Sequence, residues 1–386
     1  MNIELYSKMV RDKDFLNLKK MKYKYPNDFD DFLNALKSLA YRTLPLKDAN
    51  GNKLVFCENF YAANTSAYRA LLSEKNRDYS ETVLESEILS TAKIESIDFT
   101  RESVRNIMKG FAPKNEEEDR IYGLKCGFDF ISKVENRITE ENIYKLYMLT
   151  VGNFLDEENK LLPGRYYRHD SVYVVGNGIE HIGMNSRNLP EAISALVNFI
   201  NTGDDVNELV KAAIIHFYVA YVHPWFDGNG RMARMLHLWY LVQCGYPSTL
   251  FVPFSALISK SVKEYYAAFT KAESNQKLSG VTDVTPFVTY ITAKVYNNFS
   301  AEENLAVNQK KYAEMLNAGQ ITKKEEALWG FVVNFYIDGE FSTKQLEKDF
   351  GNAAYATIRN FVLKLENAGI FTATKYSNRV RYKISK

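Results

Sequence analysis

Residues 223–234 read HPWFDGNGRMAR and lie between two strongly apolar stretches. The preceding stretch, 208–222, is almost uniformly apolar, which is typical of a helix buried at the centre of a domain. Pro224 ends that helix, because the residue before a proline is pushed out of helical geometry. Residues 231–245 predict a second apolar helix. The sequence therefore predicts a short polar turn held between two buried helices.

The second half of this turn suits the binding of an anion. A helix that begins at Gly228, Asn229 and Gly230 offers free backbone N–H groups and the positive end of its dipole. Arg231 and Arg234 lie one helical turn apart, so both can face the same direction. Their planar guanidinium groups match the oxygens of a phosphate.

The first half of the turn supplies an acid and a base. Asp227 is a hard oxygen ligand beside the predicted anion site, which suits Mg2+ carried by a nucleotide. His223 is a general base that can work near neutral pH. An anion cradle, a metal ligand and a base together predict phosphoryl or nucleotidyl transfer to a hydroxyl.

The twelve residues also resemble the signature of the Fic (filamentation induced by cAMP) family, H-x-F-x-[D/E]-G-N-G-R-x-x-R. The one departure is Trp225, where the family usually has Phe; we expect this ring to pack in the core. Supporting resemblance runs from about residue 90 to residue 299. It includes His216, the PGRY segment at 163–166 and the GYP segment at 245–247.

The resemblance implies a mainly α fold, a Fic-type helical bundle with a β-hairpin flap, and transfer of AMP from ATP to a Ser, Thr or Tyr hydroxyl of a target protein. It implies that His223 deprotonates the hydroxyl and that Asp227 holds Mg2+ across the α- and β-phosphates. It also implies a set of phosphate-binding residues: Gly228, Asn229, Gly230, Arg231 and, at the γ-phosphate end, Arg234.

One further residue, Tyr265, is assigned by resemblance to the neighbourhood of the adenine. Tyr265, in the segment KEYYAAF, is similar to a tyrosine that packs near adenine in relatives. Some relatives have Asn eight residues later, where this chain has Glu273. The contacts to adenine or ribose therefore stay open.

Residues 90–96, STAKIES, resemble the inhibitory helix of the family, [S/T]-x-x-x-E-[G/N]. Thr91 and Glu95 match it, and Ser96 replaces Gly or Asn. The resemblance implies that Glu95 pairs with Arg234 in the place of the γ-phosphate, so that ATP binds unproductively. From the residues alone, Glu95 can equally be a solvated helix acid. In some relatives this glutamate helps remove AMP, so the reverse reaction also stays open.

The segment 171–182 predicts a β-hairpin in an otherwise helical region. Residues 171–175 have strand composition, and Gly176-Asn177-Gly178 is a strong turn signal before the return strand. An isolated hairpin leaves an open edge on which an extended chain can pair. It resembles the family's flap, which implies a protein substrate docked there as an added strand.

The last 60 residues predict a separate module. The order helix, helix, helix, hairpin is typical of a winged helix-turn-helix, and the tail is basic at Lys375, Arg379, Arg381, Lys383 and Lys386. A DNA partner and a protein partner both fit. We expect an N-terminal helical extension at 1–80, a Fic catalytic domain at 81–300 with its inhibitory helix at 81–96, a helical linker at 301–322 and the winged helix at 323–386.

The composition of the chain argues against several classes of protein and site. The 386 residues include 49 basic and 47 acidic side chains, so no global charge draws the protein to nucleic acid or membranes. Three distant cysteines, Cys57, Cys126 and Cys244, predict neither a disulfide framework nor a zinc site. The N-terminus lacks a signal-peptide pattern, and no apolar run is long enough to span a membrane. We expect a cytoplasmic protein; a homo-oligomer stays open.

Two other hypotheses about function also fit the sequence. One is a nucleotide-sensing regulator that binds DNA through its C-terminal module. The other keeps the Fic fold and changes the donor to another nucleotide or a phosphocholine compound.

Overall fold

The computed structural model describes residues 3–58, 80–175, 179–246, 249–250, 252, 254–300, 303–336, 339–376 and 379–385. These residues divide into two compact units. The first comprises Met1–Glu74, Glu85–Leu250 and Phe254–Asn298; the second comprises Lys75–Leu84, Phe251–Pro253 and Phe299–Lys386. Both are mainly helical, as the sequence predicts. Among the described helices, none has the length and apolar character needed to cross a membrane.

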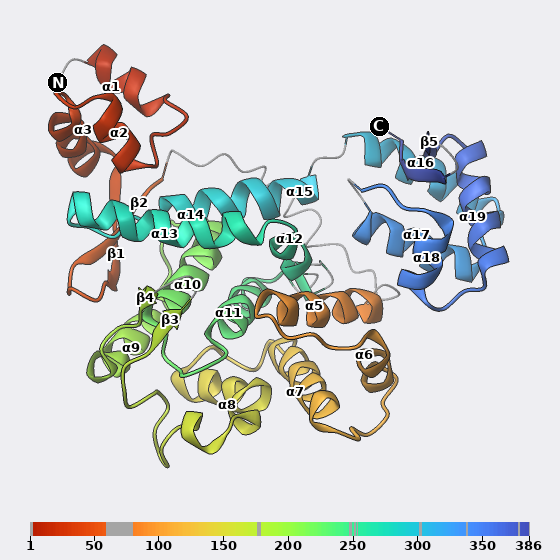
Figure 1. Cartoon of the computed structure of the whole chain (residues 1–386), viewed down its shortest axis with the longest axis horizontal. Coiled ribbons are helices and arrows are strands. Elements are labelled where there is room, and N and C mark those ends of the chain that lie inside the picture. Colours follow the sequence, from red (N-terminus) through yellow and green to blue (C-terminus); the bar gives the residue numbers. More distant parts are fainter. Residues whose placement is uncertain are drawn as a thin grey trace. The chain divides into compact units, whose positions relative to one another are not determined.

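Two buried helices form the centre of the first unit, α10 (Glu208–Val222) and α11 (Asn229–Gln243). Every residue of α10 except Glu208 and Ala220 is buried, and α11 is buried equally completely beyond its first turn. Figure 1 shows the other helices arranged around this pair. They are α5 (Ser80–Ile94), α6 (Arg101–Met108), α7 (Glu116–Ile131), α8 (Glu140–Thr150), α9 (Leu189–Asn201), α12 (Phe254–Lys260), α13 (Val262–Ser279), α14 (Thr285–Tyr290), the π-helical turn η7 (Ile291–Tyr296) and α15 (Asn297–Ser300).

Local capping explains where several of these helices begin. The hydroxyl of Thr100 accepts a hydrogen bond from the backbone N–H of Ser103 at the start of α6. The hydroxyl of Thr139 does the same for Asn142 at the start of α8. Both caps satisfy backbone donors that a helix leaves free.

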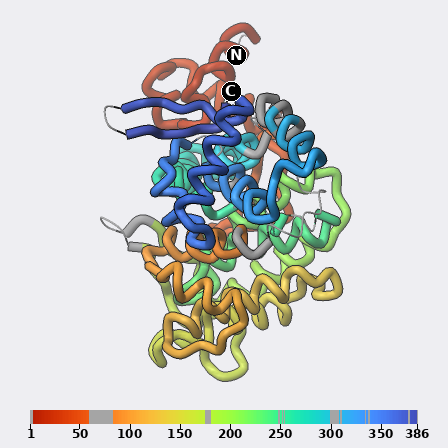
Figure 2. Tube along the Cα trace, turned by 90° about the vertical axis from the view of Figure 1, so that its right-hand side faces the viewer, coloured from red at the N-terminus to blue at the C-terminus, as the bar shows by residue number. Residues whose placement is uncertain are grey.

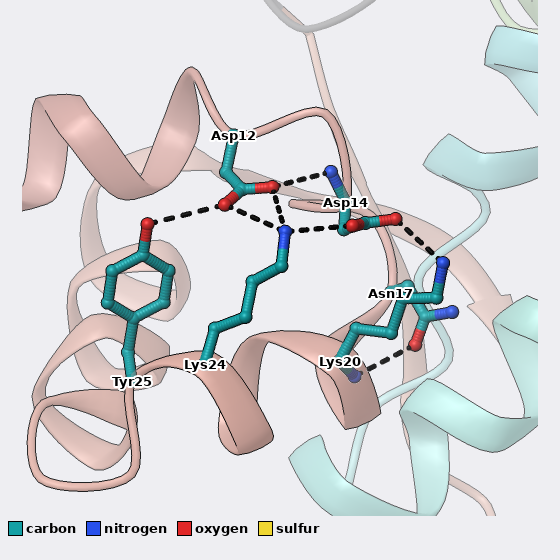
Figure 3. Close-up of polar contacts among 6 residues, drawn as sticks. All are labelled: Asp12, Asp14, Asn17, Lys20, Lys24 and Tyr25. Atoms are coloured by element: carbon teal, nitrogen blue, oxygen red, sulfur yellow. Dashed lines mark hydrogen bonds and ion pairs between the residues drawn. The ribbon is translucent and has the colours of Figure 1, made fainter.

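The N-terminal part combines a small helical cluster with a hairpin. Helices α1 (Ile3–Val10), α2 (Leu18–Lys24) and α3 (Phe29–Ala35), followed by the π-helical turn η1 (Leu36–Ala40), share one apolar core. A polar clasp fastens the loop between α1 and α2 (Figure 3): Lys24 Nζ lies 2.8 Å from carboxylate oxygens of both Asp12 and Asp14. Hydrogen bonds from Lys24 and Lys20 lower the pKa of the Asp14 carboxyl to about 2.

The expected helical extension at 1–80 also contains an antiparallel hairpin, β1 (Tyr41–Lys47) and β2 (Lys53–Cys57). Val55 joins the hairpin to the segment before α14 through two backbone hydrogen bonds, with Thr282 and Val284. Residues 59–79 lie outside the described part of the chain.

The second unit has the predicted order of elements: α17 (Lys323–Phe335), α18 (Thr343–Phe350), α19 (Tyr355–Asn367) and the hairpin β5 (Phe371–Tyr376) and β6 (Arg379–Ile384). Figure 2 shows the two strands running side by side. Phe341 and Tyr382 exchange two backbone hydrogen bonds. Phe341 thereby forms an isolated antiparallel bridge with β6. Helix α16 (Glu303–Asn317) belongs to this unit's core, because Tyr312 stacks on Trp329. The expected linker therefore packs as part of the module.

Candidate active site

The turn between α10 and α11 has a strained backbone conformation, which contacts with surrounding residues hold in place. His223 has a φ of 55°, in the left-handed region that a non-glycine residue seldom adopts. Arg168 fixes it from the side: its Nε donates to the carbonyl of His223 at 2.8 Å, and its backbone N–H donates to Pro224 at 3.0 Å. Trp225 is buried and stacks on Tyr147 with ring centroids 4.6 Å apart. The predicted core position of Trp225 is confirmed.

Asn229 closes the turn with its side chain. Its Oδ1 accepts from the backbone N–H of Trp225 at 3.0 Å, and its Nδ2 donates to the carbonyl of Trp225 at 2.8 Å. The amide side chain is thereby committed within the protein. Asn229 can therefore contribute to the expected anion cradle only through its backbone.

His223 is built as a neutral base. Its Nδ1 lies 3.1 Å from the carbonyl oxygen of Ala220, so Nδ1 carries the proton and Nε2 keeps its lone pair. Burial, together with the nearby charges of His181 and Arg168, lowers the pKa of His223 to about 4. The ring is therefore uncharged at neutral pH and can accept a proton at Nε2.

The first turn of α11 presents cationic donors that need an anion. Arg231 Nη2 lies 3.0 Å from Asp227 Oδ2, while Oδ1 of Asp227 accepts from the N–H of Gly228 at 2.6 Å. In the described structure, Arg231 Nε and Arg234 Nη1 are buried and have no hydrogen-bond partner. Buried unsatisfied donors on two guanidinium groups, at the positive end of a helix, favour a bound phosphate.

Glu95, one residue beyond α5, reaches into the same place. Its Oε1 lies 2.8 Å from Arg234 Nη2. A Cβ atom added to Gly230 would lie 2.3 Å from this Oε1, so the carboxylate sits directly on the first turn of α11. Burial disfavours the charge of Arg234, but the contacts with Glu95 outweigh it and raise the pKa of Arg234.

Two more side chains of α5 fasten it to the unit. The hydroxyl of Thr91 accepts from Arg234 Nε at 2.8 Å. Glu87, one turn earlier, accepts from the backbone N–H of Ser255 at 2.8 Å and from its hydroxyl at 2.5 Å, at the start of α12. Glu87, Thr91 and Glu95 are spaced by four residues and form one docking face.

Glu87 should make the stability of the protein depend on pH. Burial raises the pKa of its carboxyl from 4.5 to about 7. The folded chain thus binds this proton more tightly than the unfolded chain. The stabilisation is complete below pH 4.5 and is lost as pH rises through about 7. The measured quantity is the melting temperature of the parent minus that of Glu87→Gln. We expect this difference to fall by about 3–5 °C when the pH is raised from 5 to 8.

Differential scanning calorimetry checks this expectation. The exposed Glu102→Gln variant is the control, and it should follow the parent at every pH. Parallel curves for the parent and Glu87→Gln would contradict the assignment.

A cavity of about 140 Å³ adjoins His223 and Gly230. Tyr265 lines it, as expected for a residue near the base of a nucleotide, and Tyr266 and Phe269 add aromatic surface. The hydroxyl of Tyr265 lies 2.9 Å from Nε2 of His216, which fixes the ring from behind, and burial raises its pKa. The structure thereby brings the base, the phosphate end and an aromatic slot together.

The predicted hairpin forms one rim of this cavity. Strand β3 (Tyr173–Val175) pairs antiparallel with β4 (Ile179–Ile182), while the turn at 176–178 lies outside the described residues. The cavity lining includes Val174 and His181 from the two strands. Tyr173 and Ile182 are more than half exposed, at 53% and 57%.

Three residues of the site have no signal in the sequence pattern that identifies them. Arg168, Glu87 and His181 each contact a partner at least 40 positions away in the chain. An isolated buried charge, such as Arg168 in a loop, becomes informative only when its partners are known.

Comparison with known proteins shows what the region around this site resembles. Residues 137–241 match the model of the Fic/DOC family. Over 183 residues the chain is 26% identical to "Protein adenylyltransferase Fic" of Drosophila willistoni and 27% identical to that of Drosophila erecta. Each match covers 46% of this chain and 32% of the relative, so the chain aligns with about a third of their length.

A solved structure shares the fold. Fic-1 from C. elegans superposes with a TM-score of 0.50 at 18% sequence identity, over 77% of this chain and 83% of that one. The family match contains the 223–234 turn and the β3–β4 hairpin. Helices α5 and α13, which complete the site, lie outside it.

Proposed function

We propose that this protein transfers AMP from ATP to a hydroxyl of a target protein, because residues 137–241 match the model of the Fic/DOC family. The observation that carries the proposal is the pairing of a neutral His223 with two arginines whose buried donors lack partners in the described structure. A base beside an anion site is what nucleotidyl transfer to a hydroxyl needs.

In this reaction His223 Nε2 accepts the proton of the target hydroxyl as its oxygen attacks the α-phosphorus of ATP. The new P–O bond forms as the bond to the β-phosphate oxygen breaks, and pyrophosphate leaves. Backbone N–H groups at the start of α11, with Arg231 and Arg234, hold the phosphates and stabilise the charge that develops on them. The target segment pairs with the open edge of the β3–β4 hairpin, which sets its hydroxyl near His223.

Asp227 fits a role as the protein ligand of Mg2+. Its side chain is 54% exposed beside the anion site, and the described residues contain no cluster of three His, Cys, Asp or Glu side chains that could hold a metal by themselves. Mg2+ commonly binds through one carboxylate, waters and nucleotide oxygens, which this arrangement permits. When bound, the ion neutralises phosphate charge.

Asp227→Asn tests that role. The variant keeps the size of the side chain and weakens its affinity for a cation. We expect the Mg2+ concentration for half-maximal AMP transfer to rise about 10-fold, since a 10-fold effect needs only about 1.4 kcal/mol. Titration of activity with Mg2+ measures it, with the exposed Asp156→Asn variant as control. An unchanged titration curve would remove Asp227 from metal binding.

We also propose that Glu95 holds the enzyme in a low-activity state. Its carboxylate engages Arg234 and covers Gly230, where the terminal phosphate of ATP would otherwise bind. ATP then binds with its α-phosphorus displaced from His223. The same carboxylate lies close enough to the site to assist removal of AMP, so the reverse reaction belongs to the proposal.

The experiment for the whole proposal is mass spectrometry of the protein and a lysate after incubation with Mg2+ and a nucleotide. AMP should appear on a Ser, Thr or Tyr with ATP. Guanosine triphosphate and cytidine diphosphate choline serve as alternative donors. Transfer from either of these in preference to ATP would replace the donor in the proposal.

The second unit supports a separate binding role. Arg379 and Arg381 are exposed on β6, and Lys383 follows in the same two-residue alternation. Such a stripe suits phosphate contacts or an acidic protein surface. A mobility-shift assay with duplex DNA distinguishes these two partners.

A further inference from the structure

His181 of strand β4 contacts two other elements at the rim of the cavity. Its Nε2 lies 2.7 Å from the carbonyl oxygen of Tyr221, near the end of α10. Its Nδ1 lies 2.6 Å from Oε1 of Glu273, on α13. A carbonyl and a carboxylate are both acceptors, so the ring satisfies both only when each nitrogen carries a proton. His181 thereby links β4 to both α10 and α13.

The pair lies at a wall between two cavities. His181 and Glu273 line the 140 Å³ cavity next to His223, and they also line a neighbouring cavity of about 330 Å³. The side chains are partly buried, with 15% and 26% of their surfaces exposed, so solvent screens their attraction only in part. Breaking the pair would both release β4 and open this wall.

The charged and titratable groups around His181 come from each neighbouring element. Tyr221 and His223 face it from the end of α10, with ring centroids at 5.4 and 6.2 Å. Glu273 faces it from α13, and Lys277 lines the neighbouring cavity one turn further along. Glu95 lies across the smaller cavity. His181 thus lies next to His223 and contacts one carboxylate, that of Glu273.

We propose that His181 is a positioning residue: with Glu273 it clamps the β3–β4 hairpin onto α13 and the end of α10. This inference rests on the proposed function of the hairpin as the docking strand. A target strand paired with a clamped hairpin presents its hydroxyl at one fixed distance from His223. A second effect is electrostatic: His181, whose ring centroid lies 6.2 Å from that of His223, is one of the groups that lower the pKa of His223.

Three variants of the full chain, made in the Glu95→Gly background, test the clamp. They are His181→Gln, Glu273→Gln and the double variant. Each single change should raise KM for the target about 10-fold, and the double variant should be no worse than either single, because both remove one shared interaction. In His181→Gln the acid limb of the pH profile of kcat/KM should move to higher pH. Lys277→Gln, which alters the nearby charge without breaking the pair, is the control.

Two measurements without activity keep the inference separate from the proposed function. Nitrogen NMR of the histidine rings should report a doubly protonated His181 at pH 7, lost in Glu273→Gln. Hydrogen exchange of residues 179–182 should be about 10-fold faster in His181→Gln at an unchanged melting temperature. A neutral His181 or unchanged exchange would overturn the clamp. A clamp without AMP transfer in the Glu95→Gly parent would instead overturn the proposed function.

Discussion

Glu95→Gly should raise the rate of AMP incorporation about 10- to 100-fold over the parent. The substitution removes the carboxylate from Arg234 Nη2 and frees the space over Gly230. A charge-assisted hydrogen bond contributes about 1.5–3 kcal/mol, which corresponds to one to two powers of ten in the population of productively bound ATP. Incorporation of label from ATP into the protein itself and into lysate proteins measures the rate.

Matched variants separate release of the carboxylate from loosening of the helix. Lys93→Gly places the same flexible residue at an exposed position of α5 and should leave the rate at the parent level. Glu95→Gln keeps the size of the side chain, loses its charge and should fall between the two. Equal rates for Glu95→Gly and Lys93→Gly would refute inhibition by this contact.

His223→Ala should lower AMP transfer by about 10²- to 10⁴-fold when it is made in the Glu95→Gly background. General-base catalysis contributes an effect of this size, and Nε2 of His223 is the proposed acceptor of the target's proton. Calorimetric titration with ATP and Mg2+ should give a Kd within about 2-fold of the Glu95→Gly parent, since the proposed phosphate contacts come from α11.

Because the backbone of His223 is left-handed, the stability of the His223→Ala variant must also be measured. Alanine adopts that conformation no more readily than histidine, so the melting temperature must be compared with that of the parent. Loss of transfer with retained ATP binding and an unchanged melting temperature assigns the effect to the base. Transfer that persists at the parent's rate would exclude His223 as the base.

Much of the site could be predicted from the sequence because its parts are close in the chain. The i, i+4 spacing that pairs Asp227 with Arg231 is local. Helix caps at Thr100 and Thr139 need only the next three residues. The contact between Glu95 and Arg234 spans 139 positions and was expected only from family resemblance. For that contact the structure supplies the geometry that the residues alone left open.

Other features depend on contacts that no local pattern encodes. The bond between Glu87 and Ser255 joins residues 168 positions apart, and Glu87 reads in the sequence as one more helix acid. The β1–β2 hairpin also lacks a clear local sequence pattern. Its first strand alternates buried Leu44 and Leu46 with exposed neighbours, but Pro45 lies between them and weakens the strand pattern.

Gly230 carries a consequence for how this protein can change over evolution. The bare backbone that admits the carboxylate of Glu95 is the same surface on which the proposed nucleotide rests. A Cβ at 230 would meet the carboxylate of Glu95, and we expect it to obstruct the proposed nucleotide as well, so substitutions at 230 should not raise AMP transfer. In a genetic selection for hyperactive alleles, hits should fall on the α5 segment, at Thr91 and Glu95, and be absent from 228–231. Under the proposed mechanism, substitutions in this one helical segment would change inhibition without altering the 223–234 turn.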